Sequence, residues 1–197
     1  MGRIYYIFGK SASGKDTLYH LLMEDPSLSL KSIILYTTRP MREGEQDGDP
    51  YRFKTEEEFQ ALKRGGLVIE DRAYETIHGL WRYFMVKDEH LSIDRYDYLV
   101  TGGVLSSYLA VRDYFGKERV LPVYIELDDG LRLTRALARE MQPENRRFKE
   151  MCRRFLADDE DFSEEKLKKA GIERRFVNED LNSCLSEIRE YIRSTQK

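Results

Sequence analysis

The stretch Ile7-Phe8-Gly9-Lys10-Ser11-Ala12-Ser13-Gly14-Lys15-Asp16-Thr17-Leu18 decides how this chain folds. It follows the pattern G-x-x-x-x-G-K-[ST], a loop whose backbone N–H groups hold phosphate, except that Asp16 stands where Ser or Thr is expected. A β-branched and aromatic run (residues 3–8) precedes the loop, and a helical pattern (residues 15–24) follows it. Strand, loop and helix in this order are the context that the motif requires, so the sequence predicts a nucleotide phosphate site.

We expect the whole loop to bind ATP, with Lys15 at the β- and γ-phosphates. The expected ATP-binding residues of this segment are Gly9, Lys10, Ser11, Ala12, Ser13, Gly14, Lys15, Asp16 and Thr17.

The identity of the residue at position 16 matters for metal binding. Asp16 could bind Mg²⁺, because carboxylate oxygen is a hard ligand for that ion. It could instead cap the helix and leave Thr17 to the metal, or repel the phosphates and mark an inactive site. The strand around residues 98–100 ends in Thr101-Gly102-Gly103, without the carboxylate that many phosphate-loop enzymes place on a neighbouring strand. We therefore expect Asp16 to have taken over Mg²⁺ binding.

The bulk composition excludes several classes of protein. The chain has 197 residues, a formal net charge of -3 and two cysteines. This length suits one domain, and the charge gives no basic field for nucleic acid. No run is apolar enough to span a membrane, and Met1 leads directly into a strand. We expect a cytoplasmic protein with reduced, buried or half-buried thiols at Cys152 and Cys184, acting as a monomer or homodimer without nucleic-acid or membrane partners.

The remaining pattern alternates strands and helices, which predicts a parallel sheet with right-handed crossovers. Expected strands cover residues 3–8, 33–36, 51–53, 67–69, 98–100, 120–127 and 175–177. Expected helices cover residues 15–24, 55–63, 106–115, 130–140, 144–157 and 180–192, with a break at Pro143. The acidic run Asp158-Asp159-Glu160-Asp161 is expected to be a solvated helix end.

Residues 37–53 read Thr-Thr-Arg-Pro-Met-Arg-Glu-Gly-Glu-Gln-Asp-Gly-Asp-Pro-Tyr-Arg-Phe. Two guanidinium groups and a phenol, on Arg39, Arg42 and Tyr51, are suited to hold a phosphate monoester. The segment resembles the T-T-R-x-x-R-x-G-E-x-x-G-x-x-Y-x-F signature of guanylate kinases. The resemblance continues at Val68-Ile69-Glu70 and at residues 176–181, and it covers most of the chain.

The resemblance implies an α/β fold, the P-loop NTPase three-layer sandwich with a central parallel sheet. It also implies an inserted mixed α/β lobe that binds the nucleoside monophosphate (NMP) and a helical lid. Within a single domain of residues 1–197, we expect the core at residues 1–36, 85–128 and 158–197, the NMP-binding lobe at residues 37–84 and the lid at residues 129–157.

By the same resemblance, Arg39, Arg42 and Tyr51 grip the acceptor phosphate, Glu70 accepts hydrogen bonds from a guanine edge, and Asn178 lies near the adenine of ATP. Other base-reading positions depart from the family. Leu35 or Tyr36 replaces a serine, Trp81-Arg82-Tyr83-Phe84 replaces Y-Y-G-[ST], and Thr101 and Gly103 replace strand-end aspartates. Tyr83, with Tyr74, His78 and Trp81, is expected either to stack on a base or to form the core of the lobe.

Arginines are dense in the expected lid. Arg132, Arg135 and Arg139 lie on one helix face at spacings of three and four. In guanylate kinases, arginines of the equivalent segment close over the phosphates. Arg135, Arg139 and Arg154 match best, so we expect them to be catalytic together with Lys15. The alternative is a solvated face paired with Glu140 and Glu144.

These features predict ATP- and Mg²⁺-dependent phosphorylation of a nucleoside monophosphate, GMP or dGMP first, to the diphosphate. One alternative is a kinase of another nucleotide or small phosphorylated metabolite, which the altered base-reading positions favour. Another is a non-catalytic guanylate-kinase-like binding module, which the intact Gly9, Gly14 and Lys15 disfavour. A GTPase switch is the least favoured, because no segment resembles its N-K-x-D motif.

Overall fold

A five-stranded parallel sheet forms the centre of the molecule in the computed structural model, which describes residues 2–76, 79–142 and 146–196. Its strand order is β2-β7-β1-β8-β9. These strands are β1 (Ile4–Phe8), β2 (Lys31–Ser32), β7 (Tyr98–Gly102), β8 (Val120–Glu126) and β9 (Phe176–Val177). β1, the strand before the glycine-rich loop, is central and buried along its whole length, as expected of an apolar strand covered on both faces.

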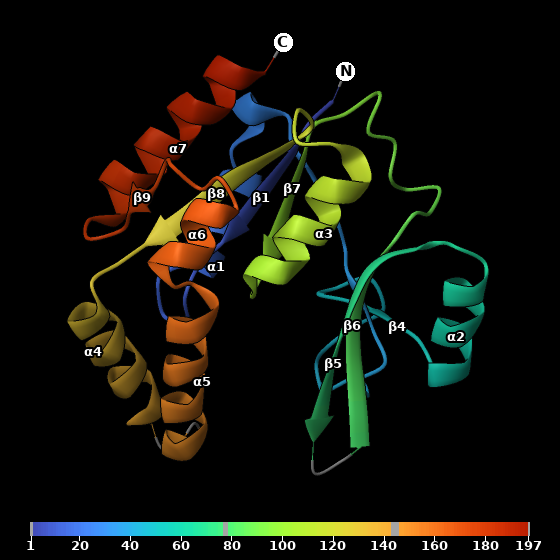
Figure 1. Ribbon diagram of the computed structural model, residues 1–197, viewed down its shortest axis with the longest axis horizontal. Coiled ribbons are helices and arrows are strands. Elements are labelled where there is room, and N and C mark those ends of the chain that lie inside the picture. Colours follow the sequence, from blue (N-terminus) through green and yellow to red (C-terminus); the bar gives the residue numbers. More distant parts are fainter. Residues whose placement is uncertain (1, 77–78, 143–145, 197) are drawn as a thin grey trace.

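Helices cover both faces of this sheet because side chains alternate along each strand. Tyr5 and Ile7 of β1 point to the layer of α1 (Lys15–Met23) and α7 (Leu181–Thr195). Tyr6 and Phe8 point to the layer of α3 (Leu105–Phe115) and α6 (Glu164–Lys169). Figure 1 shows the two layers on either side of the strands. The predicted three-layer α/β sandwich is confirmed.

A second, mixed sheet carries the lobe, with strand order β4-β3-β6-β5. It contains β3 (Tyr36–Thr37), β4 (Arg52–Phe53), β5 (Val68–Thr76) and β6 (Gly79–Val86). The helix α2 (Glu56–Arg64) begins with a capping box between Thr55 and Glu58, which satisfies two backbone N–H groups at its first turn. Phe59 of α2 and Phe84 of β6 pack edge to face, 4.8 Å apart, and hold α2 on this sheet.

The prediction of one strand at residues 33–36 is wrong. The chain pairs with the central sheet through β2 and with the lobe sheet through β3, and residues 33–35 belong to neither strand. Ile33 N–H still donates to Leu99 O of the central sheet, whereas Leu35 O accepts from Arg52 N–H of the lobe. An apolar run reads the same in both sheets, so its pattern did not reveal the crossing.

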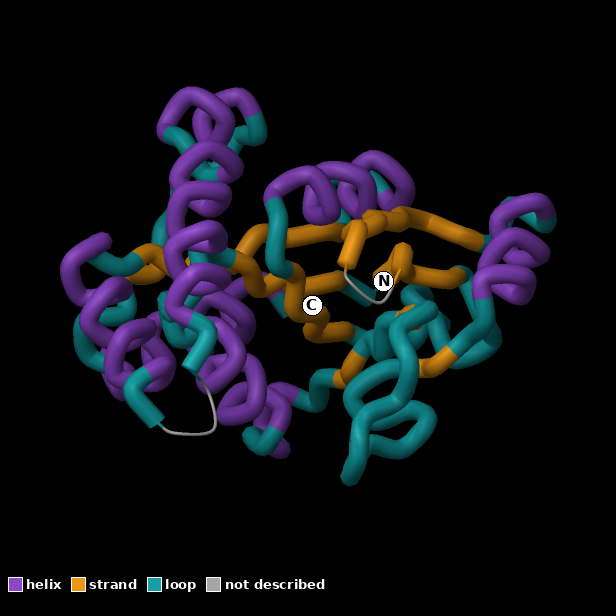
Figure 2. Tube along the Cα trace, turned by 90° about the horizontal axis from the view of Figure 1, so that it is seen from below, coloured by secondary structure: helices purple, strands orange, loops and turns teal. Residues whose placement is uncertain are grey.

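The expected lid contains two helices, α4 (Asp129–Glu140) and α5 (Phe148–Asp161). Pro143 and Glu144, between them, lie outside the described residues, as does His78 of the lobe. α4 and α5 occupy one end of the molecule, and α2 with the β5–β6 hairpin occupies the other (Figure 1). The view from below shows the same separation, with the strands between (Figure 2). The exact limits of core, lobe and lid remain our proposal.

Three smaller findings complete the fold. A short 3-10 helix, η1 (Pro26–Leu28), follows α1. Cys184 is buried, as expected, but Cys152 is exposed. Among the helices of the described residues, none has the length and apolar content needed to cross a membrane.

Candidate functional site

The glycine-rich loop runs from the end of β1 to the start of α1. Gly14 is the N-cap of α1 and has a φ of 88°, a left-handed conformation that glycine adopts without strain. A Cβ at this position would also clash with the Asn178 side-chain nitrogen. The first turn of α1 therefore depends on a glycine, and Lys15 and Asp16 follow it directly at the positive end of the helix dipole.

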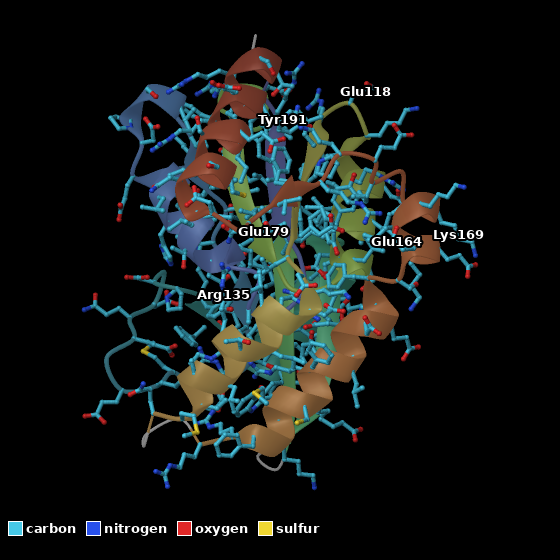
Figure 3. The ribbon with its side chains drawn as sticks, turned by 90° about the vertical axis from the view of Figure 1, so that its left-hand side faces the viewer. Glu118, Arg135, Glu164, Lys169, Glu179 and Tyr191 are labelled. Carbon is cyan, nitrogen blue, oxygen red and sulfur yellow. The ribbon has the colours of Figure 1, made fainter. Side chains whose placement is uncertain are left out.

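Hydrogen bonds of Asn178 support this loop. Its side-chain nitrogen donates to Ser13 O at 2.7 Å, and its backbone N–H donates to Glu126 O at 2.9 Å. Arg135 of α4 donates to Asn178 O at 3.1 Å. Figure 3 shows Arg135 beside the segment that carries Glu179, the residue after Asn178. Asn178 thus joins the loop to the central sheet and the lid, a bracing role that the sequence did not reveal.

Arg132 and Asp158 hold the loop from the lid side. Arg132, with 1% of its side chain exposed, donates to Ser11 O at 3.0 Å and to Asp129 at 2.8 Å. Asp158 accepts the Ser11 N–H at 2.7 Å and is 8% exposed. The prediction that the whole acidic run is solvated is therefore wrong at Asp158, because this carboxylate satisfies a loop N–H and faces the Arg132 guanidinium at 3.4 Å.

Lys10 is tied to the same acidic groups. Its ammonium lies 2.8 Å from Asp159 and 3.4 Å from Asp129. Both carboxylates are largely exposed, so these ion pairs contribute little to stability. They do connect the loop to α4 and to the end of α5.

Lys15 and Asp16 open onto a cavity of about 660 Å³, a volume in the range of small-molecule sites. The Lys15 ammonium lies 3.3 Å from the Asp16 carboxylate, whose side chain is 71% exposed. Residues of the lobe and of the strand ends complete the lining: Tyr19, His20, Ser32, Ile33, Ile34, Leu35, Gly48, Asp49, Pro50, Tyr51, Arg72, Tyr74, Tyr83, Thr101, Gly102 and Gly103. The phosphate loop and the lobe therefore share one cavity.

The side chain at position 16 suits a magnesium ion whose remaining ligands are other oxygen atoms. No group of three or more His, Cys, Asp or Glu side chains in the described ranges could hold a metal by itself. Asp16 supplies one accessible carboxylate, and Thr17 beside it is also exposed. Mg²⁺ is commonly held by one or two carboxylates together with phosphate and water oxygens. The residues present fit that arrangement.

Arg39 and Glu45 form the central ion pair of the lobe loop. Both terminal nitrogens of Arg39 donate to the Glu45 carboxylate, at 2.8 and 2.9 Å, and Arg39 is only 3% exposed. Glu45 also accepts the Arg42 backbone N–H at 2.8 Å. The bond from Arg39 and that from the Arg42 backbone lower the pKa of Glu45 from 4.5 to about 2. Glu45 thus shapes the loop that carries the predicted phosphate-binding arginines.

Three tyrosines bring this loop to the cavity. The rings of Tyr51 and Tyr83 lie 5.5 Å apart, and those of Tyr74 and Tyr83 lie 5.9 Å apart. Tyr83 also hydrogen-bonds to Arg39. The structure brings Tyr51 and Tyr83 to the cavity, whereas Arg39 and Arg42 lie outside its lining.

Glu70 lies away from the cavity surface. It is 6% exposed, and one of its carboxylate oxygens is buried without a hydrogen-bond partner in the described part of the chain. Burial raises the pKa of Glu70, partly opposed by the Arg72 guanidinium and a hydrogen bond with Ser107. Arg72 and Ser107, which the sequence did not single out, surround the residue expected to read guanine.

The remaining lid arginines point to partners within the lid. Arg139 is 51% exposed and lies 3.5 Å from Glu140, and Arg154 is 54% exposed and lies 2.8 Å from Glu150. Neither lines the cavity, and Arg135 does not line it either. Arg139 and Arg154 thus lie apart from the cavity, whereas the Arg135 guanidinium already lies beside the loop, 3.7 Å from where a Cβ at Gly14 would stand.

The Glu45 ion pair makes a testable prediction. Because the folded-state pKa of Glu45 lies below its ordinary value, its ionised form stabilises the fold above about pH 4.5, and this contribution disappears as the pH falls toward 2. Glu45→Gln should lower the urea midpoint at pH 7, and the gap to the unmodified protein should narrow below pH 4.5. Glu43→Gln, in an exposed position of the same loop, is the control; a gap that stays constant with pH contradicts the assignment.

Two comparisons with known proteins bear on this arrangement. A guanylate kinase family model matches residues 1–79, which contain the phosphate loop and most of the lobe. The crystal structure of guanylate kinase from Anaplasma phagocytophilum superimposes with a TM-score of 0.68 at 21% sequence identity, covering 99% of this chain and 86% of that one. Residues 1–79 thus match the guanylate kinase family model, and the chain as a whole has a fold similar to that of the guanylate kinase structure.

Proposed function

We propose that this protein transfers the γ-phosphoryl group of ATP to the phosphate of a nucleoside monophosphate, with GMP or dGMP as the first candidates. One observation carries the proposal: a single cavity is lined by Lys15 of the phosphate loop and by Tyr51 and Tyr83 of the lobe. Phosphoryl transfer needs a donor and an acceptor phosphate in line within one enclosed site, and little covalent help from the protein. A shared cavity of this kind allows a donor and an acceptor phosphate to meet in one site.

In the proposed reaction, an oxygen of the acceptor phosphate attacks the γ-phosphorus of ATP, and the bond from that phosphorus to the β-phosphate oxygen breaks to release ADP. The residues around the cavity supply positive charge and hydrogen bonds. Lys15 binds the β- and γ-phosphates, and Tyr51 and Tyr83 hold the acceptor. Arg39 and Arg42, which lie outside the cavity lining here, would have to turn toward the cavity to join them. No dedicated base is needed, because a phosphate monoester is mostly dianionic at neutral pH.

Asp16, with Thr17 as the alternative, would hold Mg²⁺ on the ATP phosphates, where the ion neutralises negative charge. Arg135 already lies beside Gly14 of the phosphate loop, whereas Arg139 and Arg154 would reach the phosphates only after the lid moves toward the lobe, since neither lines the cavity here. Lid closure of this kind is common among kinases, because it excludes water from the reaction. We also propose that the adenine of ATP binds near the segment that carries Asn178, whose own side chain is buried against Ser13, and that the protein is cytoplasmic.

A second candidate is a kinase of another small phosphorylated compound. Ile33, Ile34 and Leu35 form an apolar wall of the cavity, and Glu70 is absent from its lining. A wall of this kind offers little to read a guanine edge, so these observations favour an acceptor that is not selected by its base. A non-catalytic binding module remains the third alternative and predicts no turnover with any acceptor.

The activity itself is tested by ADP release from ATP and Mg²⁺ against a panel of ribo- and deoxynucleoside monophosphates. We expect turnover with at least one of them, and a loss of about 10²–10³-fold in Lys15→Ala, because removal of one group that stabilises transition-state charge has this effect. Turnover confined to GMP and dGMP would support guanine reading by Glu70. Binding of ATP without turnover of any nucleoside monophosphate would contradict the proposal and favour the second candidate.

The metal assignment has its own test. Asp16→Asn keeps the shape of the side chain but removes its charge, so it should raise the Mg²⁺ concentration needed for half-maximal turnover by about tenfold or more, as expected when one charged hydrogen-bonding or metal-binding group is lost. Thr17→Val is the matched variant at the alternative ligand. If Thr17→Val rather than Asp16→Asn raises the Mg²⁺ requirement, the assignment to Asp16 is wrong.

A further inference from the structure

Arg72 is the only arginine among the described residues that line the cavity. It lies in β5 directly opposite Tyr83 of β6, so the two side chains share one face of the hairpin and are close neighbours. Tyr74, two residues further along β5, lies on the same face and also lines the cavity. Tyr51 lines the same cavity, so Arg72 and these three tyrosines share one site.

A hydrogen bond to α3 fixes the orientation of the Arg72 guanidinium. The guanidinium donates to the Ser107 hydroxyl of α3 at 3.0 Å, and Ser107 is 3% exposed. Glu70, two residues before Arg72, is on the same side of β5 and also hydrogen-bonds with Ser107. The carboxylate therefore lies behind the guanidinium and not at the cavity surface, so its charge compensates Arg72.

Arg39, one of the two arginines predicted to bind the acceptor phosphate, is already occupied. Arg39 donates to both oxygens of Glu45 and to Pro40 O at 2.8 Å. Arg72, in contrast, donates to the Ser107 hydroxyl at 3.0 Å, lies near the buried Tyr6 hydroxyl and Glu70, and has a side chain that reaches the cavity. A guanidinium that is partly desolvated and fixed in orientation binds phosphate oxygens strongly, because its planar N–H groups match them in pairs.

We propose that Arg72 binds the phosphate of the acceptor, and that Glu70 positions Arg72 instead of reading a base. This inference rests on the proposed function, since it assigns residues to the acceptor side of the same cavity. It explains why Glu70 is buried and beside a cation. It also implies that the phosphate, and not the base, supplies most of the acceptor affinity.

Binding measurements without ATP separate this inference from the transfer reaction. The probes are ribose 5-phosphate, which carries a phosphate but no base, GMP, which carries both, and guanosine, which carries only the base. Calorimetric titration of each into the protein gives its dissociation constant. We expect ribose 5-phosphate to bind nearly as well as GMP, and guanosine to bind much more weakly than either.

Arg72→Gln should weaken the binding of ribose 5-phosphate and GMP alike, by about 10- to 100-fold, which is the effect of losing a charged hydrogen bond to phosphate. Arg72→Lys keeps the charge but loses the planar group, so its dissociation constants should lie between those of the unmodified protein and those of Arg72→Gln. Arg64→Gln, at an exposed position on α2, is the matched control and should change neither constant. Unchanged binding of ribose 5-phosphate in Arg72→Gln overturns the proposal.

Glu70→Gln decides between positioning and base reading. A positioning role predicts that it weakens ribose 5-phosphate and GMP by the same factor, and that the acceptor KM rises while the ATP KM is unchanged. A base-reading role predicts weaker binding of GMP alone, which overturns the second half of the proposal. Arg72→Gln leaves the buried Glu70 carboxylate without its cation, which could destabilise the fold. The double variant Arg72→Gln/Glu70→Gln removes that unpaired charge, and an ATP titration checks that each variant is folded.

The outcomes also separate this inference from the proposed function. Phosphate binding that depends on Arg72, without phosphoryl transfer to any acceptor, leaves the inference standing and removes the kinase activity. If the protein phosphorylates a nucleoside monophosphate and Arg72→Gln leaves the acceptor KM unchanged, the kinase activity stands and the assignment of Arg72 is wrong. If the unmodified protein binds neither ribose 5-phosphate nor GMP, the assignment of Arg72 is wrong whatever the enzyme does with ATP.

Discussion

The contact between Gly14 and Asn178 is the constraint on which the site depends. Asn178 donates to Ser13 O at 2.7 Å, and a side chain at position 14 would occupy the same space. This contact fixes the loop against the end of β9, while the left-handed φ of Gly14 turns the chain into α1. Lys15 therefore enters the cavity from a helix start whose position is set by buried groups. Loss of either residue would leave the first turn of α1 without its support.

Two buried or half-buried carboxylates control the arginines of the lobe. Glu45 engages Arg39 through both oxygens, and Glu70 lies beside Arg72 and Ser107. A guanidinium taken out of water needs a nearby anion, since an uncompensated buried charge is strongly destabilising. The two pairs differ in what they leave accessible, because only Arg72 lines the cavity. An arginine-rich motif thus does not by itself show which arginine meets a ligand.

Much of the fold was predictable because it follows from periodicity and from residues with special backbone roles. The β1–loop–α1 unit and α7, which begins after Asp180, are set by an apolar run, a glycine and an N-cap, all local in sequence. The crossing at residues 33–35 was not predictable, because an apolar segment fits either sheet. The burial of Asp158 was also hidden, since its partner Ser11 lies 147 positions away.

The same limits apply to the site. Lys15, Asp16 and Tyr51 follow from motifs and lie at the cavity, but Arg72 matches no motif and gains its position from pairing with Tyr83 across the hairpin. Such a neighbour can be found only once the register of β5 and β6 is known. The inward or outward direction of Arg39 likewise depends on Glu45, which the pattern contains but does not connect to it.

The central claim is that a donor and an acceptor phosphate face each other across one cavity. It is tested most directly with a bisubstrate analogue in which adenosine and guanosine are joined by five phosphates, titrated into the protein by calorimetry. Because one molecule would fill both halves of the site without a second loss of translational freedom, we expect it to bind at least 100-fold more tightly than ATP or GMP. An affinity no greater than that of ATP alone would contradict the claim.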